Sequence, residues 1–271
     1  CWIEKWYAET GTAGIELLGR VMSLYDHRLI AGITPDAARV YELYKIPILN
    51  EMPRGIGIID HAKCAARFEI HDHDSLERML AGSIVLNPLE DSSGIRHVER
   101  FDPDEEFGFD GWNAIRGYGR RTGAYLNWRY FDIPRHNYEA ISGNGGQFAV
   151  YRTETIKGFE ESVIRILEWN FSDGWAERAI AAILEVGKRS GAIMIDFFCT
   201  AREILKDMER LGFIPDSLFA KSIIPSLFRP LFRAEGVRVA IDIPPHRSLR
   251  KGAFDNWYIT KGDSDLDRIK L

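Results

Sequence analysis

The chain has 271 residues, enough for one large domain or two ordinary domains with buried cores. Its hydrophobic content of 45% and aromatic content of 12% exclude intrinsic disorder as the default state. With 40 acidic and 35 basic residues the net charge is -5, which argues against broad, nonspecific binding to nucleic acid or to an anionic membrane surface.

The N-terminal part of the chain alternates between strand and helix patterns. The predicted elements are a strand over residues 2–8, a helix over 12–25, a strand over 28–33, a helix over 35–44 and a short apolar strand over 55–59. Their order is β-α-β-α-β. Because the chain begins with Cys1 rather than Met, and a strand pattern already starts at Trp2, we expect the sequence to begin inside a domain.

The helix predicted over residues 35–44 has a well-marked start. Thr34 is a good N-cap, Pro35 fits the first helical position, and Asp36 suits the positive end of the helix dipole. The residues that share one apolar face are Ala37, Val40, Tyr41 and Tyr44. The two tyrosines are either core residues with their hydroxyls at the rim or part of a functional site.

Residues 71–124 show no sustained period. They are rich in acidic, aromatic and turn residues, so we interpret them as a connector that packs partly across two halves. His71 to Asp74 read HDHD, which are good metal-ligand types. We favour a helix cap instead of a metal site, because Asp74 and Ser75 lead into a helix pattern and adjacent residues on an extended segment point to alternate sides.

The strand and helix alternation returns in the C-terminal half. The predicted elements are strands over 162–171 and 192–199 and helices over 174–188 and 201–211. Further strands are predicted over 147–152, 237–243 and 257–260. Thr200 and Glu203 have the spacing of a capping box for the last helix. Residues 262–268, GDSDLDR, lack the glycine and distant glutamate of a calcium loop and suggest a solvated tail. The elements together predict a mixed α/β sheet covered by helices.

Two passages carry a family resemblance. One is WIEKWYAETGTAGIELL near the N-terminus, and the other is YLNWRYFDIPRHNYEAI, followed by a strand pair, a helix and DMERLGF. They resemble the GNAT superfamily of acyl-CoA-dependent N-acyltransferases, specifically its long bacterial members with two GNAT-like halves. The resemblance implies tandem GNAT-like domains of mixed α/β (α+β) type: residues 1–70 as the C-terminal part of a first domain that lacks its N-terminal elements, 71–124 as a connector, and 125–271 as a second domain.

The resemblance implies acetyl-CoA or another acyl-CoA as co-substrate. In this family, backbone N–H groups of a glycine-bearing turn that opens a helix bind the pyrophosphate. The residues that match this turn are Gly11, Thr12, Ala13, Gly14 and Ile15. The match is partial, because Thr12 stands where the family has its first glycine and Glu9 where it has a basic or amide residue. In the second half the matching turn is residues 172–176, with Gly174 as its one permissive residue.

The resemblance also implies a tyrosine that protonates the departing thiolate, and it assigns this role to Tyr41. Met208 stands at the corresponding position of the second half, where methionine cannot give up a proton, so tyrosine chemistry favours the first half. Glu4 is the one candidate general base, on the same side of the first predicted strand as Trp2 and Trp6. The alternative is that Glu4 faces solvent or forms an ion pair with a Lys or Arg.

An aromatic and basic cluster lies in the second passage. Its members are Trp128, Arg129, Tyr130, His136 and Tyr138. Such side chains can stack on a sugar or pair with a phosphate. The alternation of residues 126–131, LNWRYF, also fits a strand whose Trp and Phe fill the core.

We therefore predict an N-acyltransferase that moves an acetyl or other acyl group from acyl-CoA to an amine of a small acceptor, such as an amino sugar or amino-acid derivative. The alternatives are a noncatalytic GNAT-like binding or regulatory protein and an aminoacyl transferase on a related paired fold. We expect no metal, nucleic-acid or membrane partner, and a homodimer stays open. Cys1, Cys64 and Cys199 lack disulfide or zinc spacing, and the sequence has neither an apolar run of ~18 residues nor a leader, so we expect a cytoplasmic protein.

Overall fold

The computed structural model describes residues 13–24, 28–67, 92–134, 136–156, 158–172, 174–219, 237–242 and 254–264. The chain divides into two compact units. Unit 1 comprises Cys1–Met52 and Gly236–Ala253, and unit 2 comprises Pro53–Glu235 and Phe254–Leu271. The strand predicted over residues 2–8 lies outside the described residues.

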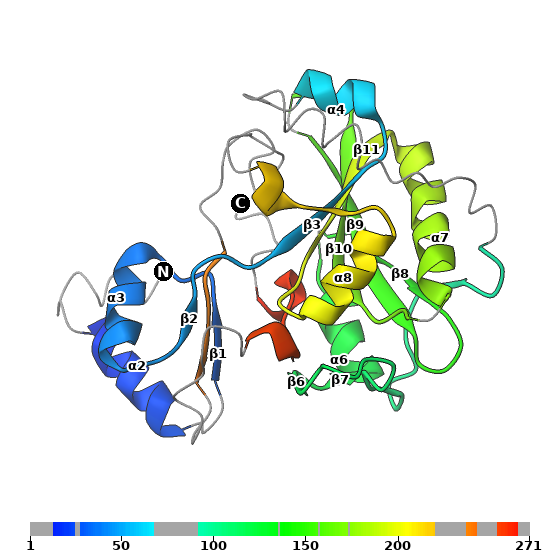
Figure 1. The fold of residues 1–271 in the computed structure, drawn as a ribbon. Coiled ribbons are helices and arrows are strands. Elements are labelled where there is room, and N and C mark those ends of the chain that lie inside the picture. Colours follow the sequence, from blue (N-terminus) through cyan, green and yellow to red (C-terminus); the bar gives the residue numbers. More distant parts are fainter. Residues whose placement is uncertain are drawn as a thin grey trace. The chain divides into compact units, whose positions relative to one another are not determined.

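Unit 1 contains a three-stranded antiparallel sheet and two helices (Figure 1). In chain order its elements are α2 (Ala13–Leu24), β1 (Arg28–Ala31), α3 (Pro35–Leu43), β2 (Ile48–Leu49) and β13 (Val239–Asp242). β13 is the middle strand, with β1 on one side and β2 on the other. The helix, strand and helix predicted within residues 12–44 are confirmed. They enclose a small core of Ile33, Ala38, Ile46 and Ala240.

α3 begins as its sequence predicts. The side-chain oxygen of Thr34 accepts a hydrogen bond from the backbone N–H of Ala37 at 3.2 Å, which satisfies one of the first-turn amides. Pro35 occupies the first helical position, where no intrahelical N–H is needed. Lys45, just beyond the helix, has a φ of 57°, and this left-handed residue turns the chain toward β2.

Unit 2 is built on a seven-stranded mixed sheet with the order β12-β3-β11-β10-β9-β8-β4. Its strands are β3 (Arg54–Ile58), β4 (Arg96–Val98), β8 (Glu139–Ser142), β9 (Phe148–Thr155), β10 (Ser162–Trp169), β11 (Ala192–Phe198) and β12 (Ile214–Pro215). β10 and β11 run parallel, and the other neighbouring pairs run antiparallel. The predicted mixed sheet and its strands over 147–152, 162–171 and 192–199 are therefore confirmed.

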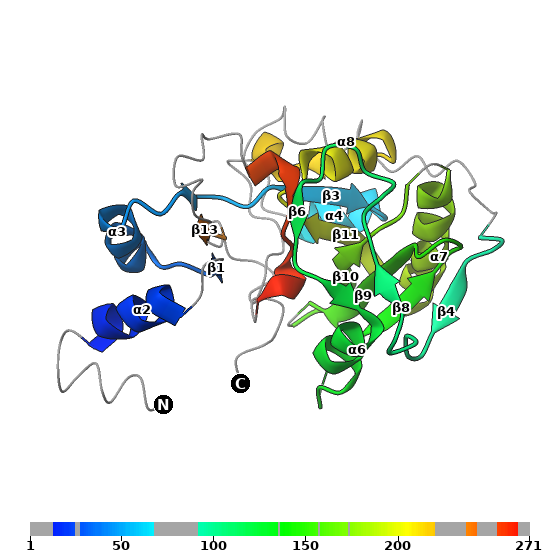
Figure 2. The same ribbon diagram turned by 90° about the horizontal axis from the view of Figure 1, so that it is seen from below.

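Helices cover both faces of the sheet of unit 2 (Figure 2). α7 (Trp175–Ser190) and α8 (Arg202–Arg210) pack on one face, and α6 (Gly123–Leu126) with the π-helical turn Asn127–Phe131 packs on the other. α4 (His61–Arg67) contacts the start of β11. Every residue of β10 and β11 is buried, as the apolar run IMIDFFC predicts for a central strand between two helical layers.

Short elements complete the described part of unit 2. β5 (Glu106–Phe107) pairs with β7 (Arg121–Thr122), and β6 (Gly117–Tyr118) pairs with β14 (Trp257–Tyr258). Short 3-10 turns lie at Asp216–Phe219, Phe254–Asn256 and Lys261–Asp263. The backbone N–H of Thr200 donates to the carbonyl of Ile259 at 3.0 Å, so the C-terminal segment lies beside the end of β11.

The units do not follow the predicted domain boundaries after residues 70 and 124. β3, predicted as the last strand of the first half, pairs with β11 in unit 2, and β13 is the middle strand of unit 1. β4, inside the predicted connector, is an edge strand of the seven-stranded sheet. Local periodicity identifies a strand but not its partner, because pairing depends on hydrogen bonds to a distant segment. Two complete tandem GNAT-like halves are not confirmed.

The strand alternative for residues 127–131 is wrong. These residues form a π-helical turn that continues α6, and Trp128 is 62% exposed instead of buried. Local capping decides the conformation. The side chain of Thr122 accepts a hydrogen bond from the backbone N–H of Tyr125 at 3.1 Å. The side-chain amide of Asn127 accepts a hydrogen bond from the N–H of Phe101 and donates one to the carbonyl of the same residue.

The capping box predicted at Thr200 and Glu203 is also wrong. The Thr200 hydroxyl donates to the carbonyl of Trp257 and accepts from the N–H of Ile259 at 3.2 Å. Glu203 Oε2 accepts the backbone N–H of Ala114 at 2.7 Å. Both side chains therefore bind other segments, and α8 begins without a side-chain cap.

Two kinds of structural feature are absent from the described residues of both units. No helix within the described ranges is both long and apolar enough to cross a membrane. In the same ranges, no three His, Cys, Asp or Glu side chains gather where they could hold a metal ion. His71 to Asp74 lie outside those ranges.

Candidate functional site

The pairing of the parallel strands β10 and β11 stops before the end of β10, and we call this point the strand opening. Their pairing runs from Ser162↔Ala192 to Ile166↔Phe197, although β10 continues to Trp169. At the same point β10 bulges against β9, so that Leu167 has no residue opposite it. As a result, Leu167 and the next residue, Glu168, both face the side of the sheet that α6 covers. Leu167 belongs to the same core cluster as Tyr130, and Glu168 accepts a hydrogen bond from the Tyr130 hydroxyl.

A buried carboxylate, Glu168, forms the centre of a polar cluster at this opening. Tyr130 donates its hydroxyl to Oε1 at 2.8 Å, and Tyr258 donates to Oε2 at 3.0 Å. Arg121 donates from Nε to Oε1 at 3.1 Å and from Nη2 to Asp263 at 2.8 Å. The cluster thus joins β10, β7, the π-helical turn after α6 and the C-terminal segment by charge-assisted hydrogen bonds.

The protonation of the Glu168 cluster follows from its burial. Burial raises the pKa of Glu168, and the guanidinium of Arg121 offsets this only in part. Burial also raises the pKa values of Tyr130 and Tyr258 well above 10.0, with the Glu168 charge adding to the effect. Both phenols therefore remain protonated donors. Burial acts to lower the pKa of Arg121, but Asp263 and Glu168 outweigh it and keep the guanidinium charged.

Tyr258 closes the opening between the two strands. Its hydroxyl accepts the backbone N–H of Trp169 at 2.8 Å, so the amide that follows the bulge is already satisfied. Its ring packs on Phe109 with centroids 4.2 Å apart. The phenol of Tyr258 therefore lies at the end of β10, and Thr260 of the same segment bridges Cys199 just beyond the end of β11.

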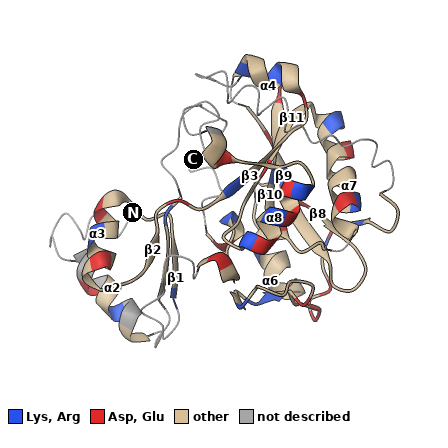
Figure 3. Ribbon diagram, viewed as in Figure 1, with Lys and Arg blue, Asp and Glu red and all other residues tan. Residues whose placement is uncertain are grey.

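A second charged cluster lies on the central strands of the sheet (Figure 3). Asp196 Oδ2 lies 2.6 Å from Arg54 Nη2 and 3.3 Å from Arg165 Nη1. Arg165 Nε lies 2.8 Å from Glu154 Oε2, and Arg152 reaches the same carboxylate at 3.2 Å. Four neighbouring strands, β3, β9, β10 and β11, are therefore connected by ion pairs inside the protein.

The charge of Asp196 makes the stability of unit 2 sensitive to acid. Burial opposes ionisation of Asp196, but Arg165 and Arg54 outweigh burial and hold its pKa below 3.8. Because the pKa is lower in the folded state than in the unfolded state, this stabilisation is complete above about pH 4 and is lost as the pH falls through the lowered pKa.

We expect Asp196→Asn to be less stable than the native protein near neutral pH and to lose less stability on acidification. The measurement is the urea midpoint of both proteins between about pH 7 and pH 3. Equal acid-dependent losses in the two proteins would show that Asp196 is not the titrating group.

Lys261 is a buried amine beside this cluster. Its Nζ lies 4.6 Å from the ring centroid of Phe198, and among the described residues it has no hydrogen-bond partner. Burial lowers its pKa well below 10.5, and the nearby Arg165 lowers it further. The ammonium form is thus disfavoured, and Lys261 is held as a largely apolar side chain over an aromatic ring.

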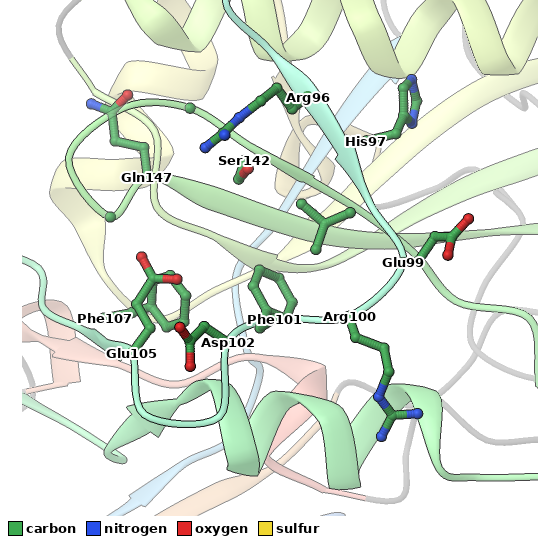
Figure 4. A pocket seen from close by; sticks show the side chains of 13 residues that line it. Arg96, His97, Glu99, Arg100, Phe101, Asp102, Glu105, Phe107, Ser142 and Gln147 are labelled. Carbon is green, nitrogen blue, oxygen red and sulfur yellow. The ribbon is translucent and has the colours of Figure 1, made fainter.

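A cavity of about 540 Å³ lies over β4, at one edge of the seven-stranded sheet. Its walls come from β4, from the segment that follows it as far as Phe107, and from the turn between β8 and β9. Figure 4 shows Arg96 reaching over Ser142 on one side, with Asp102 and Glu105 beside Phe107 on the other. The volume is that of an ordinary small-molecule site.

The predicted phosphate turns are described only in part. Ala13, Gly14 and Ile15 form the first turn of α2, whereas Gly11, Thr12 and the predicted base Glu4 lie outside the described residues. In the second half, Gly174 has the left-handed φ of 77° that precedes α7, and this helix has no side-chain cap.

Tyr41, the predicted acid, lies half-buried on α3. It packs with Ala37 against the small core of unit 1, and burial raises its pKa above 10.0. Tyr44 is 36% exposed, so the helix places one tyrosine on its inner side and not two. The equivalent position of α8 holds Met208, which is buried in the main core of unit 2.

Four members of the aromatic and basic cluster of residues 128–138 contact one another. Arg129 lies over the ring of Tyr130, Tyr130 packs against Tyr138, and Tyr138 lies beside His136. Arg129 is buried and donates to the carbonyls of Gly262 and Ser264, which holds the C-terminal segment. Tyr130 is buried on Glu168, and Trp128 faces solvent. The members in contact therefore extend from the Glu168 cluster, and Trp128 lies apart from them at the surface.

Sequence reasoning missed Glu168, Tyr258, Arg121, Asp263 and Lys261. A signal existed for one of them, because Glu168 interrupts the apolar run of a central strand, where a charge needs a partner. Asp263 was assigned to a solvated tail, but its side chain is 7% exposed and bonded to Arg121. The partners come from segments far apart in the chain, so spacing could not reveal them.

No protein-family model and no curated protein matches this chain. A solved structure that does match is a conserved protein of unknown function and probable N-acyltransferase from Enterococcus faecalis V583. The neighbour is a weak one. It is 13% identical with a TM-score of 0.36, and the match covers 84% of this chain and 48% of that one, about half its length.

Proposed function

We propose that the protein is an acyl-CoA-dependent N-acyltransferase whose transfer chemistry belongs to unit 1. The observation that carries the proposal is the equivalence of two helices. α3 follows β1 and α8 follows β11, both have 9 residues, and Tyr41 and Met208 each stand at the seventh position. A phenol at this position can protonate a departing thiolate, and a thioether cannot.

The arrangement of unit 2 supports the same class of reaction. A bulged strand, a left-handed glycine, an uncapped helix and a parallel strand follow one another from β10 to β11. We propose that two such strands allow an extended acyl-CoA to lie between them and that the N-terminus of the helix suits the phosphates of the CoA. In unit 2 this opening is occupied by Tyr258, so unit 2 retains the framework while unit 1 has the reactive phenol.

In the proposed reaction, the acceptor amine attacks the carbonyl carbon of the thioester in unit 1. The C–N bond forms as the C–S bond breaks, Glu4 takes the proton lost from nitrogen, and Tyr41 gives its proton to the thiolate. A raised pKa keeps Tyr41 protonated until that step. The first-turn amides at Ala13, Gly14 and Ile15, with Gly11 and Thr12 before them, would bind the pyrophosphate.

The proposed donor is acetyl-CoA or a longer acyl-CoA, and the proposed acceptor is a small amine such as an amino sugar or amino-acid derivative. Calorimetry and thermal shift with acetyl-CoA and longer acyl-CoAs test donor binding by the full chain. We expect Tyr41→Phe to bind the donor normally and to lose about 100-fold or more in kcat, because general-acid assistance has that size.

Tyr44→Phe is the matched control, since it removes a phenol three residues further on, at the exposed C-cap of the same helix. It should leave kcat unchanged. A second candidate function, a noncatalytic binding protein, is favoured by the closure of the strand opening by Tyr258. Failure of every acyl-CoA to bind would contradict the transferase and support the binding protein.

A further inference from the structure

The cavity over β4 is lined by charges of both signs that lack protein partners. Strand alternation places Arg96 and Val98 on one face of β4 and His97 on the other, and all three line the cavity. Within the described part of the chain, the guanidinium of Arg96 has no ion-pair partner, and neither has the carboxylate of Glu105. The two charges also make no ion pair with each other, although both line the same cavity.

Neighbouring charges behave differently. Arg100 pairs with Asp132 at 2.5 Å, and Arg120 pairs with Glu106 through two hydrogen bonds of 2.8 and 2.9 Å. Arg100 also lines the cavity, but its guanidinium is already paired with Asp132. Arg96 is therefore the lining arginine left for a ligand, and a ligand that spans the cavity can pair with both Arg96 and Glu105.

The wall between the two charges is apolar. Phe101 and Phe107 are buried members of the core on the α6 side of the sheet, and Val98 packs against them. Ser142 and Gln147 add polar groups from β8 and the turn that follows it. Such a lining suits a molecule with an apolar middle and polar ends.

The anionic side of the cavity is held in place by backbone hydrogen bonds. The N–H of Glu105 donates to the carbonyl of Asp102 at 3.1 Å, and the N–H of Gly123 at the start of α6 donates to the carbonyl of Glu105 at 2.8 Å. On the cationic side, Arg96 lies on a strand that pairs with β8. A site held in this way loses little conformational freedom when it binds.

We propose that this cavity binds a small zwitterion whose opposite charges stand at its two ends, in the size class of a dipeptide. The terminal carboxylate pairs with Arg96, and the ammonium group pairs with Glu105 and the adjacent Asp102. An extended dipeptide spans roughly 7 Å, and its side chains can contact Phe101 and Phe107.

This site is separate from Tyr41 and from the strand opening, so the proposal stands or falls without acyl transfer. The test is calorimetry of the full chain with the dipeptide alanylphenylalanine and no acyl donor. We expect binding of the free dipeptide, and about tenfold weaker binding of its N-acetyl derivative and of its C-terminal amide, because each loses one charged contact.

Variants assign the contacts. Arg96→Gln should lower the affinity for the free dipeptide about tenfold and leave the affinity for its C-terminal amide unchanged. Glu105→Gln should lower the affinity for the free dipeptide about tenfold and leave the affinity for its N-acetyl derivative unchanged. Arg120→Gln and Glu106→Gln make the same changes of charge outside the cavity and should bind like the native protein. Absence of binding by the native chain, or native affinity in both cavity variants, would overturn the proposal.

Discussion

Replacement of Arg121 by methionine is expected to lower the free energy of unfolding by about 3–5 kcal/mol, because breaking a buried ion pair leaves uncompensated charge in the interior. Arg121 is 1% exposed and connects Glu168 with Asp263. Methionine fills much of the same volume but donates no hydrogen bond, so two carboxylates would remain buried without their cation. Urea unfolding followed by tryptophan fluorescence measures the loss.

Arg120 is the natural control for Arg121. It is the preceding residue and also pairs with a glutamate, but it is 73% exposed. Arg120→Met should leave the free energy of unfolding nearly unchanged, because water replaces the lost contact. Adding Glu168→Gln to Arg121→Met should restore part of the stability by removing one of the orphaned charges. Equal losses at positions 120 and 121 would contradict the buried cluster.

Gly123→Ala is expected to destabilise unit 2 by about 3 kcal/mol or more, because the added methyl group meets backbone that cannot move aside. A Cβ at this position would overlap the carbonyl of Asp102, whose segment is held against α6 by the bond from Gly123 N–H to Glu105. The constraint is one of space, since Gly123 has no positive φ. Chemical denaturation measures the change.

Gly19→Ala is a matched control of opposite sign. Gly19 lies inside α2, and a Cβ built there has nothing within 4 Å. Alanine is favoured over glycine inside a helix by about 0.5–1 kcal/mol, so this variant should be slightly more stable than the native protein. If Gly123→Ala were as stable as Gly19→Ala, the tight contact between α6 and Asp102 would not exist. A folded Gly123→Ala protein would also be expected to bind the dipeptide more weakly, because Glu105 would shift.

The buried clusters and the proposed reaction bear on different parts of the chain. The Glu168 cluster joins β10 of unit 2 to the segment that contains Tyr258 and Asp263. The proposed transfer chemistry uses Tyr41 of unit 1. A loss of stability in Arg121→Met without loss of acyl-CoA binding would therefore agree with both.

Local signals in the sequence were sufficient for the elements of strong periodicity. The N-cap at Thr34, the helices α2, α3, α7 and α8, and the buried strands β10 and β11 were all predicted close to their observed bounds. These features depend on residues a few positions apart, which is the range over which helical spacing and capping act. The place of Tyr41 on the inner side of α3 follows from the same spacing, whereas its role as the acid comes from the family resemblance and stays a prediction.

Tertiary structure alone decided the strand partners and the polar clusters. It assigned β3 to unit 2 and β13 to unit 1, turned residues 127–131 into a π-helical turn, and brought Glu168 together with Tyr258. Each of these depends on hydrogen bonds between segments far apart in the chain. A charge on a buried strand signals that a partner must exist, but only the packing of the whole unit determines which side chain it is.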